Sequence, residues 1–330
     1  MSLPSSSDVK ALAKAGNFQE LQQRWNDGER FDLAVVFDRA VTDYRTVKRV
    51  PGHLEILKFC VEQGMPLDVR PDWLGQTAFC SAARYGNNEF VAFVAAKCGV
   101  PDSLFARAAV GDDGLMGSLR EATDLSGLNL LHFVAGSGLG RRDEDTKHRL
   151  TKLCDWLVEQ KVSTTLAVQD EVSITPTLLC AWYGGNPEIM NRLISAGEIN
   201  VGSLHQAVEF ALEPHQRSGP AFHEVAEVIL CHGFDVNSMR PEQGRMLLHG
   251  AAHRGSTNAV KWLLDHSANP NVLDKERRTP LHLAAIRNTH ASVAKLLLEA
   301  GSKRDAVDTH GRMAIDYAHE KGRLKIAAVL

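Results

Sequence analysis

The pattern of apolar and polar positions in RRTPLHLAAIRNTHASVAKLLLEAG, residues 277–301, predicts two short helices joined by a turn. Thr279 is a residue type that caps helix N-termini, and Pro280 suits the first helical position, where a backbone N–H has no partner. The second helix has apolar residues at the i, i+3, i+4 and i+7 spacing of one helical face, namely Val293, Leu296, Leu297 and Ala300. Gly301 then favours a left-handed C-cap. Because neither helix can bury its apolar face alone, the pair is expected to stack against neighbouring pairs.

The same pattern recurs along the chain with a period of about 33 residues. A Leu-His pair at His249 recurs 33 residues later at His282, and Asp316 occupies the corresponding position 34 residues further on. Weaker copies occur at 51–64, 75–99, 127–138 and 175–197. This period, together with the T-P-L-H-x-A pattern of TPLHLAA at 279–285, resembles the ankyrin repeat.

The resemblance implies an all-α ankyrin-repeat solenoid, in which stacked helix-turn-helix units are connected by short β-hairpin loops. We expect one array over residues 1–330 with about nine or ten units. Its parts are degenerate repeats at 8–74, repeats at 75–126, repeats at 127–200 with an insertion at 136–149, repeats at 201–243 with an insertion at 213–222, and regular repeats at 244–330. The glycine-rich segment GSGLG at 136–140 is expected to form a flexible inserted loop.

Composition narrows the class of protein. Hydrophobic residues make up 44% of the 330 residues, charged residues 23%, and the net charge is −3, so binding to nucleic acid is not expected. No apolar run is long enough for a membrane span. Six cysteines stand singly in apolar segments, at Cys60, Cys80, Cys98, Cys154, Cys180 and Cys231. Their spread predicts reduced, buried thiols in a protein of the cytoplasm or nucleus, and we expect it to be a monomer.

Candidate reactive groups do not assemble into a known catalytic pattern. His249 and His253 are four residues apart, as metal ligands can be, but the HGAAH segment has no Glu between them. The GSGLG segment with Arg141 has a composition suited to phosphate, but it follows a predicted helix and no GK[ST] motif is present. The single cysteines have no adjacent base. The sequence therefore predicts no catalytic residue, no metal site and no cofactor.

The resemblance also implies roles for particular residues. The structural positions of the repeat are His132, His249, Thr279, Pro280 and His282, and the histidines would bond backbone groups of the hairpin loops. In ankyrin arrays the partner-binding concave face is built from hairpin tips and the two residues after the Ala-Ala pair. Transferred position by position, that face comprises Trp73, Gln76, Arg84, Tyr85, Trp182, Tyr183, Arg245, His253, Arg254, Arg278 and Arg287.

These positions predict a non-catalytic adaptor that binds a protein or peptide on its concave face. Aromatic residues gather in the central units, and large rings are frequent anchors of protein interfaces. Arginines gather in the C-terminal units, where a local basic stripe favours an acidic partner. Two alternatives stay open. One is an ankyrin-repeat enzyme or small-molecule-binding protein whose pocket is roofed by the insertions at 136–149 and 213–222; the other is an ankyrin segment of a larger multidomain protein.

Overall fold

The computed structural model describes residues 6–43, 51–66, 77–98, 104–116, 128–141, 143–166, 174–197, 201–212, 223–240, 244–287 and 291–330. These residues are predominantly helical, as the sequence predicts, and an isolated antiparallel bridge joins Arg240 to Arg245. The chain divides into two compact units, Met1–Glu198 with Pro214–Pro220, and Ile199–Glu213 with Ala221–Leu330. None of the helices in the described ranges has the length and apolar character needed to cross a membrane.

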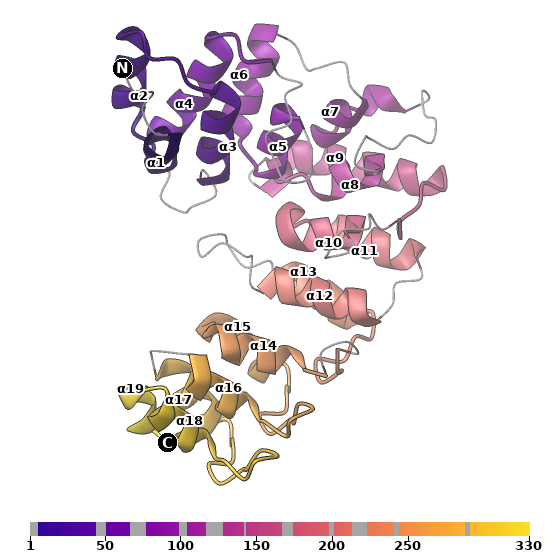
Figure 1. Ribbon diagram of the computed structural model, residues 1–330. Coiled ribbons are helices and arrows are strands. Elements are labelled where there is room, and N and C mark those ends of the chain that lie inside the picture. The colour runs from indigo at the N-terminus through magenta and orange to yellow at the C-terminus, as the bar shows by residue number, and fades with distance from the viewer. Residues whose placement is uncertain are drawn as a thin grey trace. The chain divides into compact units, whose positions relative to one another are not determined.

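In the first unit, short helices follow one another in pairs (Figure 1). The pairs begin with α1 (Ser6–Ala15) and α2 (Phe18–Asn26), α3 (Leu33–Asp43) and α4 (Pro51–Glu62), and α5 (Ala78–Arg84) and α6 (Asn88–Cys98). Next come α7 (Leu104–Ala109) with the 3-10 turn η1 (Asp113–Leu115), and α8 (Leu130–Ala135) with the 3-10 turn η2 (Leu139–Arg141) and α9 (Glu144–Glu159). The last pair is α10 (Pro176–Leu179), continued by the π-helical segment η3 (Cys180–Gly184), with α11 (Pro187–Ala196).

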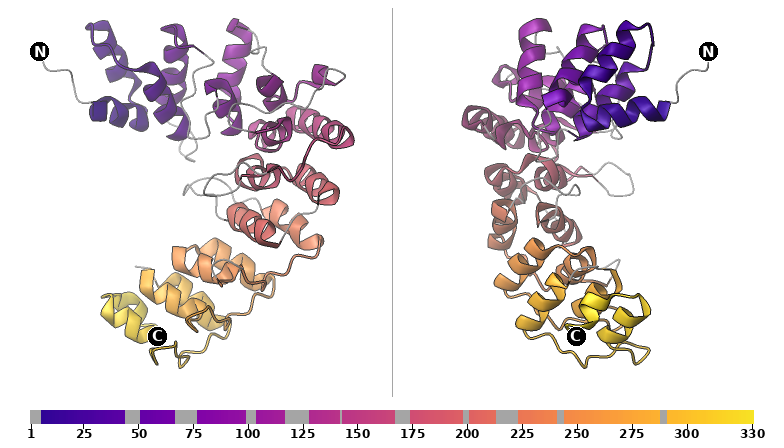
Figure 2. Two further views of the ribbon diagram at one scale, coloured as in Figure 1. Left: turned by 45° about the vertical axis from the view of Figure 1, so that its right-hand side comes forward. Right: turned by 90° about the vertical axis from the view of Figure 1, so that its left-hand side faces the viewer.

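The second unit repeats one arrangement four times (Figure 2). Its pairs are α12 (Val201–Leu212) with α13 (His223–Cys231), α14 (Leu247–Arg254) with α15 (Thr257–Asp265), α16 (Pro280–Arg287) with α17 (Ser292–Glu299), and α18 (Ala314–Glu320) with α19 (Leu324–Ala327). The first helices α14, α16 and α18 pack directly on one another, as do the second helices α15 and α17. Stacking therefore buries the narrow apolar faces that a single pair leaves open.

Buried histidines join each of three repeats to the next one. The Nδ1 atoms of His132, His249 and His282 accept the backbone N–H three residues earlier, at 3.1, 3.3 and 3.1 Å. Their Nε2–H groups donate to the carbonyls of Ile174, Arg278 and Arg312, at 3.3, 2.9 and 3.0 Å. Each acceptor carbonyl lies two residues before the first residue of the first helix in the following repeat. This geometry requires the neutral imidazole, and burial lowers the pKa of all three histidines, that of His132 to about 4.

Asparagine side chains make a second set of bonds between successive loops of the second unit. Asn237 donates from Nδ2 to the Ser267 carbonyl at 3.2 Å and accepts the Asn269 N–H at 2.8 Å. Asn271 repeats this with the Gly301 carbonyl and the Lys303 N–H, at 3.0 and 2.8 Å. Each amide thus satisfies one donor and one acceptor of the next loop, which fixes the spacing of neighbouring repeats.

The segment at 136–149 differs from the expected insertion. Residues 144–149 belong to α9, residues 139–141 form η2, and Ser137 and Leu139 are buried. The Gly138 N–H donates to the Ala83 carbonyl at 3.1 Å, and the Ser137 hydroxyl donates to the Ala109 carbonyl at 2.7 Å. The prediction of a flexible loop at 136–140 is therefore wrong, because these residues pack and bond against α5 and α7. The insertion at 213–222 lies outside the described residues.

Lys161 occupies a backbone conformation that glycine usually takes. It follows α9 with φ 60°, where Gly233 and Gly301 end α13 and α17 with φ 86° and 91°. An L-residue in the left-handed region costs roughly 1 kcal/mol. We expect Lys161→Gly to raise the free energy of unfolding by up to about 1 kcal/mol, measured by urea denaturation, because the gain exceeds the added entropy of the unfolded chain. A decrease would contradict this assignment of strain.

Candidate functional site

The aromatic residues of the first unit form a packed cluster rather than an open patch. The rings of Tyr85, which follows α5, and Tyr183, in η3, meet edge to face with centroids 5.5 Å apart. Trp182 stacks on Tyr183 at 5.0 Å, and the Arg84 guanidinium lies 5.4 Å from the centre of the Tyr183 ring. Arg84, Tyr85 and Tyr183 are buried, whereas Trp182 is half-buried. Partner binding by these four residues stays a prediction, and burial leaves three of them little surface for a partner. Trp73 and Gln76 lie outside the described residues.

Glycines allow this cluster to form, because three backbones come together beside it. Residues 137 and 138 run between the end of α5 and the end of η3. A Cβ on Gly138 would lie 2.5 Å from the Arg84 carbonyl oxygen, and one on Gly184 would lie 2.0 Å from the Ala135 carbonyl oxygen. Arg141 ties the same segment to α5 by donating from Nη2 to the Tyr85 carbonyl at 2.8 Å. The cluster is thus part of the packing between repeats of the first unit.

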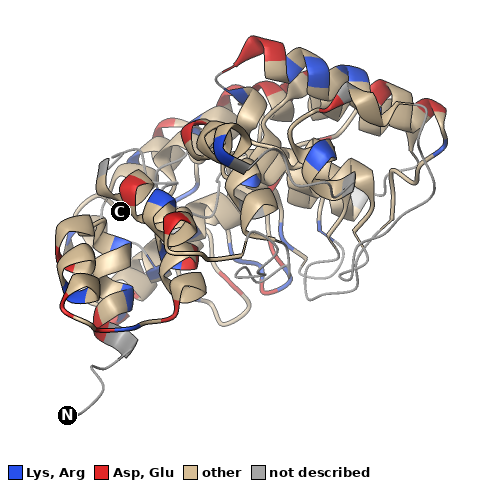
Figure 3. Ribbon diagram, turned by 90° about the horizontal axis from the view of Figure 1, so that it is seen from above, with Lys and Arg blue, Asp and Glu red and all other residues tan. Residues whose placement is uncertain are grey.

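The arginines of the second unit lie on the hairpin loops and the ends of the first helices. Arg245 and Arg278 both pair with the buried carboxylate of Asp274, at 3.8 and 2.8 Å. Arg254, at the end of α14, pairs with Glu209 of α12. Arg287, at the end of α16, is exposed and makes no ion pair with another described residue. Basic and acidic residues are otherwise mixed along the helices (Figure 3).

We call Arg245, Arg254, Arg278 and Arg287 the arginine cluster. Their charges affect the pKa of His253. Partial burial lowers the pKa of His253, and the charges of Arg287, Arg245, Arg254 and Arg278 lower it further. A second positive charge at His253 is therefore disfavoured. Four guanidinium groups from two successive repeats therefore lie close enough to His253 to act on it together.

Comparison with known proteins defines the family. A model described as ankyrin repeats in three copies matches residues 204–308 and 248–330, most of which belong to the second unit. This chain contains ankyrin repeats. The E3 ubiquitin-protein ligase KEG of Arabidopsis thaliana is 25% identical over 255 residues, which are 74% of this chain and 14% of that protein. The putative E3 ubiquitin-protein ligase XBAT35 of the same plant is 43% identical over 65 residues, 19% of this chain and 14% of that protein.

The matches are not confined to plant proteins. The protein fem-1 homolog C of Xenopus laevis is 38% identical over 63 residues, 19% of this chain and 10% of that protein. The ankyrin-repeat chain therefore spans about a seventh or less of the length of these three relatives. Ankyrin repeats are generally protein-interaction modules. The matches therefore support a role in protein interaction.

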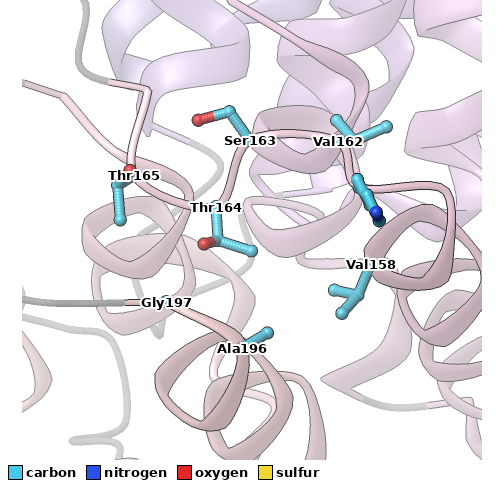
Figure 4. A pocket seen from close by; sticks show the side chains of 8 residues that line it. Val158, Val162, Ser163, Thr164, Thr165, Ala196 and Gly197 are labelled. Atoms are coloured by element: carbon cyan, nitrogen blue, oxygen red, sulfur yellow. The ribbon is translucent and has the colours of Figure 1, made fainter.

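A cavity of about 460 Å³ lies in the first unit, where α9 and α11 end. Figure 4 shows its lining, which includes Val158, the consecutive hydroxyl residues Ser163, Thr164 and Thr165, and Gly197. Lys161 contributes the charged group of the lining. The described wall contains no carboxylate and no histidine, so it offers no pair of groups for general acid and base catalysis. The cavity is open and lies apart from the residues that the repeat pattern singles out.

The cysteines whose side chains the structure describes are of two kinds, and the side chain of Cys98 lies outside that description. Cys60, Cys80, Cys154 and Cys180 are buried, as the sequence predicts, and burial raises the pKa of Cys60 and of Cys180 to about 12. The prediction of a buried thiol is wrong for Cys231, which ends α13 and is exposed. High pKa values keep the buried thiols protonated and poorly nucleophilic. Within the described ranges, no group of three His, Cys, Asp or Glu side chains could hold a metal ion.

Proposed function

We propose that this ankyrin-repeat chain is a non-catalytic adaptor that binds an acidic segment of a partner protein. The binding surface in this proposal is the face of the second unit that carries the hairpin loops and the ends of α14 and α16. Its centre is the arginine cluster around His253. The ankyrin repeats support binding to a protein, and the grouping of four arginines around His253 supports the choice of an acidic partner.

The arrangement of the arginines suits a partner whose binding segment contains carboxylate side chains. Asp274 holds Arg245 and Arg278 at the loops, and Glu209 holds Arg254, so these guanidinium groups are oriented before any partner binds. Arg287 is exposed and available for a new ion pair. Preorganised cations lose little conformational entropy on binding, and complementary charge speeds association and favours an acidic partner over a basic one.

Fewer aromatic residues of the first unit are accessible to a partner than the sequence predicts. Arg84, Tyr85 and Tyr183 contribute to packing, so in this proposal Trp182 is the aromatic anchor that the first unit can still present. It belongs to a different unit from the arginine cluster, and the two surfaces are therefore tested separately.

The arginine cluster is tested by reversing its charge. We expect the double variant Arg254→Glu and Arg287→Glu to bind a fluorescent peptide composed of Asp and Glu at least about tenfold more weakly than the parent in an anisotropy titration at low salt. Arg287→Glu alone should give part of this loss without disturbing the pair between Arg254 and Glu209.

The matched control carries the same change in net charge on the second helices of the same repeats. Lys261 and Lys295 are exposed on α15 and α17, and the variant Lys261→Glu with Lys295→Glu should lose no more than about twofold. Equal losses for both double variants would mean that net charge alone governs binding, and the arginine cluster would then be rejected as the site.

A further inference from the structure

Three side chains of the second unit meet between the second helices of two consecutive repeats. The Glu227 carboxylate of α13 lies 2.9 Å from Nε2 of His266, the C-cap residue of α15, and it accepts the Nε1–H of Trp262 at 3.2 Å. The His266 ring stacks on the Trp262 indole, with centroids 3.9 Å apart and an interplanar angle of 24°. Trp262 is buried, and Glu227 and His266 are half-buried. We call Glu227, Trp262 and His266 the His266 clip.

The clip departs from the repeat pattern at all three of its positions. Ser267 and Gly301, which are 34 residues apart, both follow a second helix with a positive φ, of 65° and 91°, and so set the register of the two repeats. In the same register, the residues that correspond to the clip at the junction of α15 and α17 are Lys261, Leu296 and Ala300. They offer no carboxylate, no indole and no imidazole. The side chains that differ from the repeat are therefore the ones that contact one another.

Both nitrogens of the His266 ring face hydrogen-bond acceptors. Nε2 faces the Glu227 carboxylate, and Nδ1 lies 2.7 Å from the carbonyl oxygen of Trp262. A carbonyl oxygen and an ionised carboxylate accept hydrogen bonds but cannot donate them. A neutral imidazole has one N–H and can donate to only one of the two acceptors, whereas the imidazolium has two and can donate to both. The geometry of the clip therefore fits the protonated ring.

The surroundings of the ring also favour a positive charge. The Trp262 carbonyl belongs to the last turn of α15, where the helix dipole attracts cations, and the indole face on which His266 lies attracts them too. From α13 the ring meets Glu227, and His223 of the same helix lies beside Trp262 with ring centroids 6.2 Å apart. Asp265 precedes His266 in the chain. Within the described ranges, no charged residue of α14 or α17, the helices packed on α15, forms an ion pair with His266.

The first helices of the same two repeats are joined by an ion pair of another kind. Glu209 of α12 pairs with Arg254 of α14. Arginine stays charged over the whole physiological pH range, whereas histidine ordinarily titrates between pH 5 and 8. The junction is thus held by a permanent cation at its first helices and by a titratable one at its second helices.

We propose that the His266 clip is a proton-dependent fastening between the repeat of α12 and α13 and the repeat of α14 and α15. With its proton bound, the His266 ring holds both the Glu227 carboxylate and the end of α15. When the proton leaves, one of the two acceptors faces a nitrogen lone pair, and that contact opens while Arg254 and Glu209 stay paired. The fastening operates whether or not the arginine cluster binds a partner.

The clip responds to pH in the opposite direction to the buried histidines. The protonated form of His266 has the acidic partner in the folded protein, so its contribution to stability is present at low pH and is lost as the pH rises through the titration of the ring. Burial lowers the pKa of His132, so its contribution is lost as the pH falls. A rise in pH therefore loosens the junction of α13 and α15 while the neutral histidines keep their bonds.

Hydrogen exchange of the backbone amides of α13 tests the clip in the full chain. At each pH the exchange rate in His266→Gln is divided by the rate in the parent, so the intrinsic pH dependence of exchange cancels. We expect a ratio of roughly three at pH 6, the size of effect that a half-exposed ion pair gives, and a ratio near one at pH 8, because glutamine and the neutral ring each donate a single bond. Glu227→Gln should show the same dependence on pH.

His223→Gln is the matched control, because His223 also lies on α13 beside the Trp262 ring but forms no ion pair with another described residue. It is expected not to raise the exchange rate at pH 6. A ratio for His266→Gln that is the same at pH 6 and pH 8, or an equal rise in His223→Gln, would overturn the proposal. The protein labelled with ¹⁵N-histidine gives a direct second measurement. Both ring nitrogens of His266 should carry hydrogen at pH 6, and a ring with a single N–H at that pH would reject the clip.

Discussion

Replacing Gly184 with Ala is expected to lower the free energy of unfolding by roughly 3 kcal/mol, the upper end of the range for overpacked interiors. The new Cβ would lie 2.0 Å from the Ala135 carbonyl oxygen. The carbonyl belongs to the backbone and the backbone also fixes the position of a Cβ, so no side-chain rotation relieves the contact, and η3 must move away from α8. That movement would separate Tyr183 from Tyr85 and weaken the aromatic cluster. Urea denaturation followed by tryptophan fluorescence measures the loss, with Trp182 as a local probe.

Gly250→Ala is the matched control for this substitution. Gly250 lies inside α14, where a Cβ would meet only the end of the Arg254 side chain, at 3.2 Å. Alanine is the better helix former by about 1 kcal/mol, so the same change is expected to be neutral or stabilising here. A loss at Gly184 no larger than the effect at Gly250 would show that the close approach of α8 and η3 is not required.

Acidification from pH 6.5 to pH 4 is expected to remove about 3 kcal/mol of stability through His132 alone. Burial lowers the pKa of His132 from 6.5 in the unfolded chain to about 4 in the folded protein. Between these values the unfolded state binds more protons than the folded state, so stability falls as the pH falls. The contribution is complete above pH 6.5 and is lost by about pH 4. His249 and His282 act in the same direction because burial lowers their pKa values too.

His132→Gln isolates this effect. The variant is expected to be less stable than the parent at neutral pH, since the bonds to Asn129 and Ile174 are altered, but its stability should change less between pH 6.5 and pH 4. His319→Gln, at an exposed position of α18, should keep the parent's pH dependence. Parallel curves for the parent and His132→Gln would mean that His132 is not held as a buried neutral ring. Urea denaturation at half-unit pH steps gives these curves.

Below pH 4 the protonation of buried carboxylates in the second unit is expected to lower the stability of the protein further. Burial alone would raise the pKa of Asp308, but the Tyr317 hydroxyl and the N–H groups of Arg312 and His310 hold it well below its usual range. Burial would likewise raise the pKa of Asp274, but the hydrogen bond from the Arg278 side chain lowers it. The pKa of Asp274 is therefore also below its usual value. A carboxyl with a lowered pKa contributes stability above its unfolded pKa and loses it as the pH falls.

Local rules were sufficient to predict the helices of the regular repeats. The spacing of Val293 and Leu297, the Thr-Pro start at Thr279 and the glycine at Gly301 each act within one or two helical turns, so the sequence alone predicts them. The periodic Leu-His pair was enough to identify the ankyrin family, because the repeat recurs at a constant separation in the chain. The prediction that all units form one array stays a prediction, as does the assignment of the binding face.

Contacts between distant residues could not be predicted in this way. Tyr85 and Tyr183 are separated by two intervening repeats in the chain, and their meeting depends on the backbone approach at Gly138 and Gly184. The exposure of Cys231 and the burial of Arg84 depend equally on which neighbours cover them, because an amphipathic pattern marks a face without saying how completely it is covered.

The sequence by itself thus determined the helices of the regular repeats, because these follow from short-range spacing. Its resemblance to ankyrin repeats indicated the family and the roles of His132, His249 and His282. The tertiary structure alone decided that the predicted aromatic anchors are largely packed inside the first unit. It also decided that acidic side chains orient Arg245, Arg254 and Arg278 and that Met239, Leu273 and Val307 are exposed. The physical reason is that burial and charge pairing depend on side chains brought together by stacking, which no local pattern specifies.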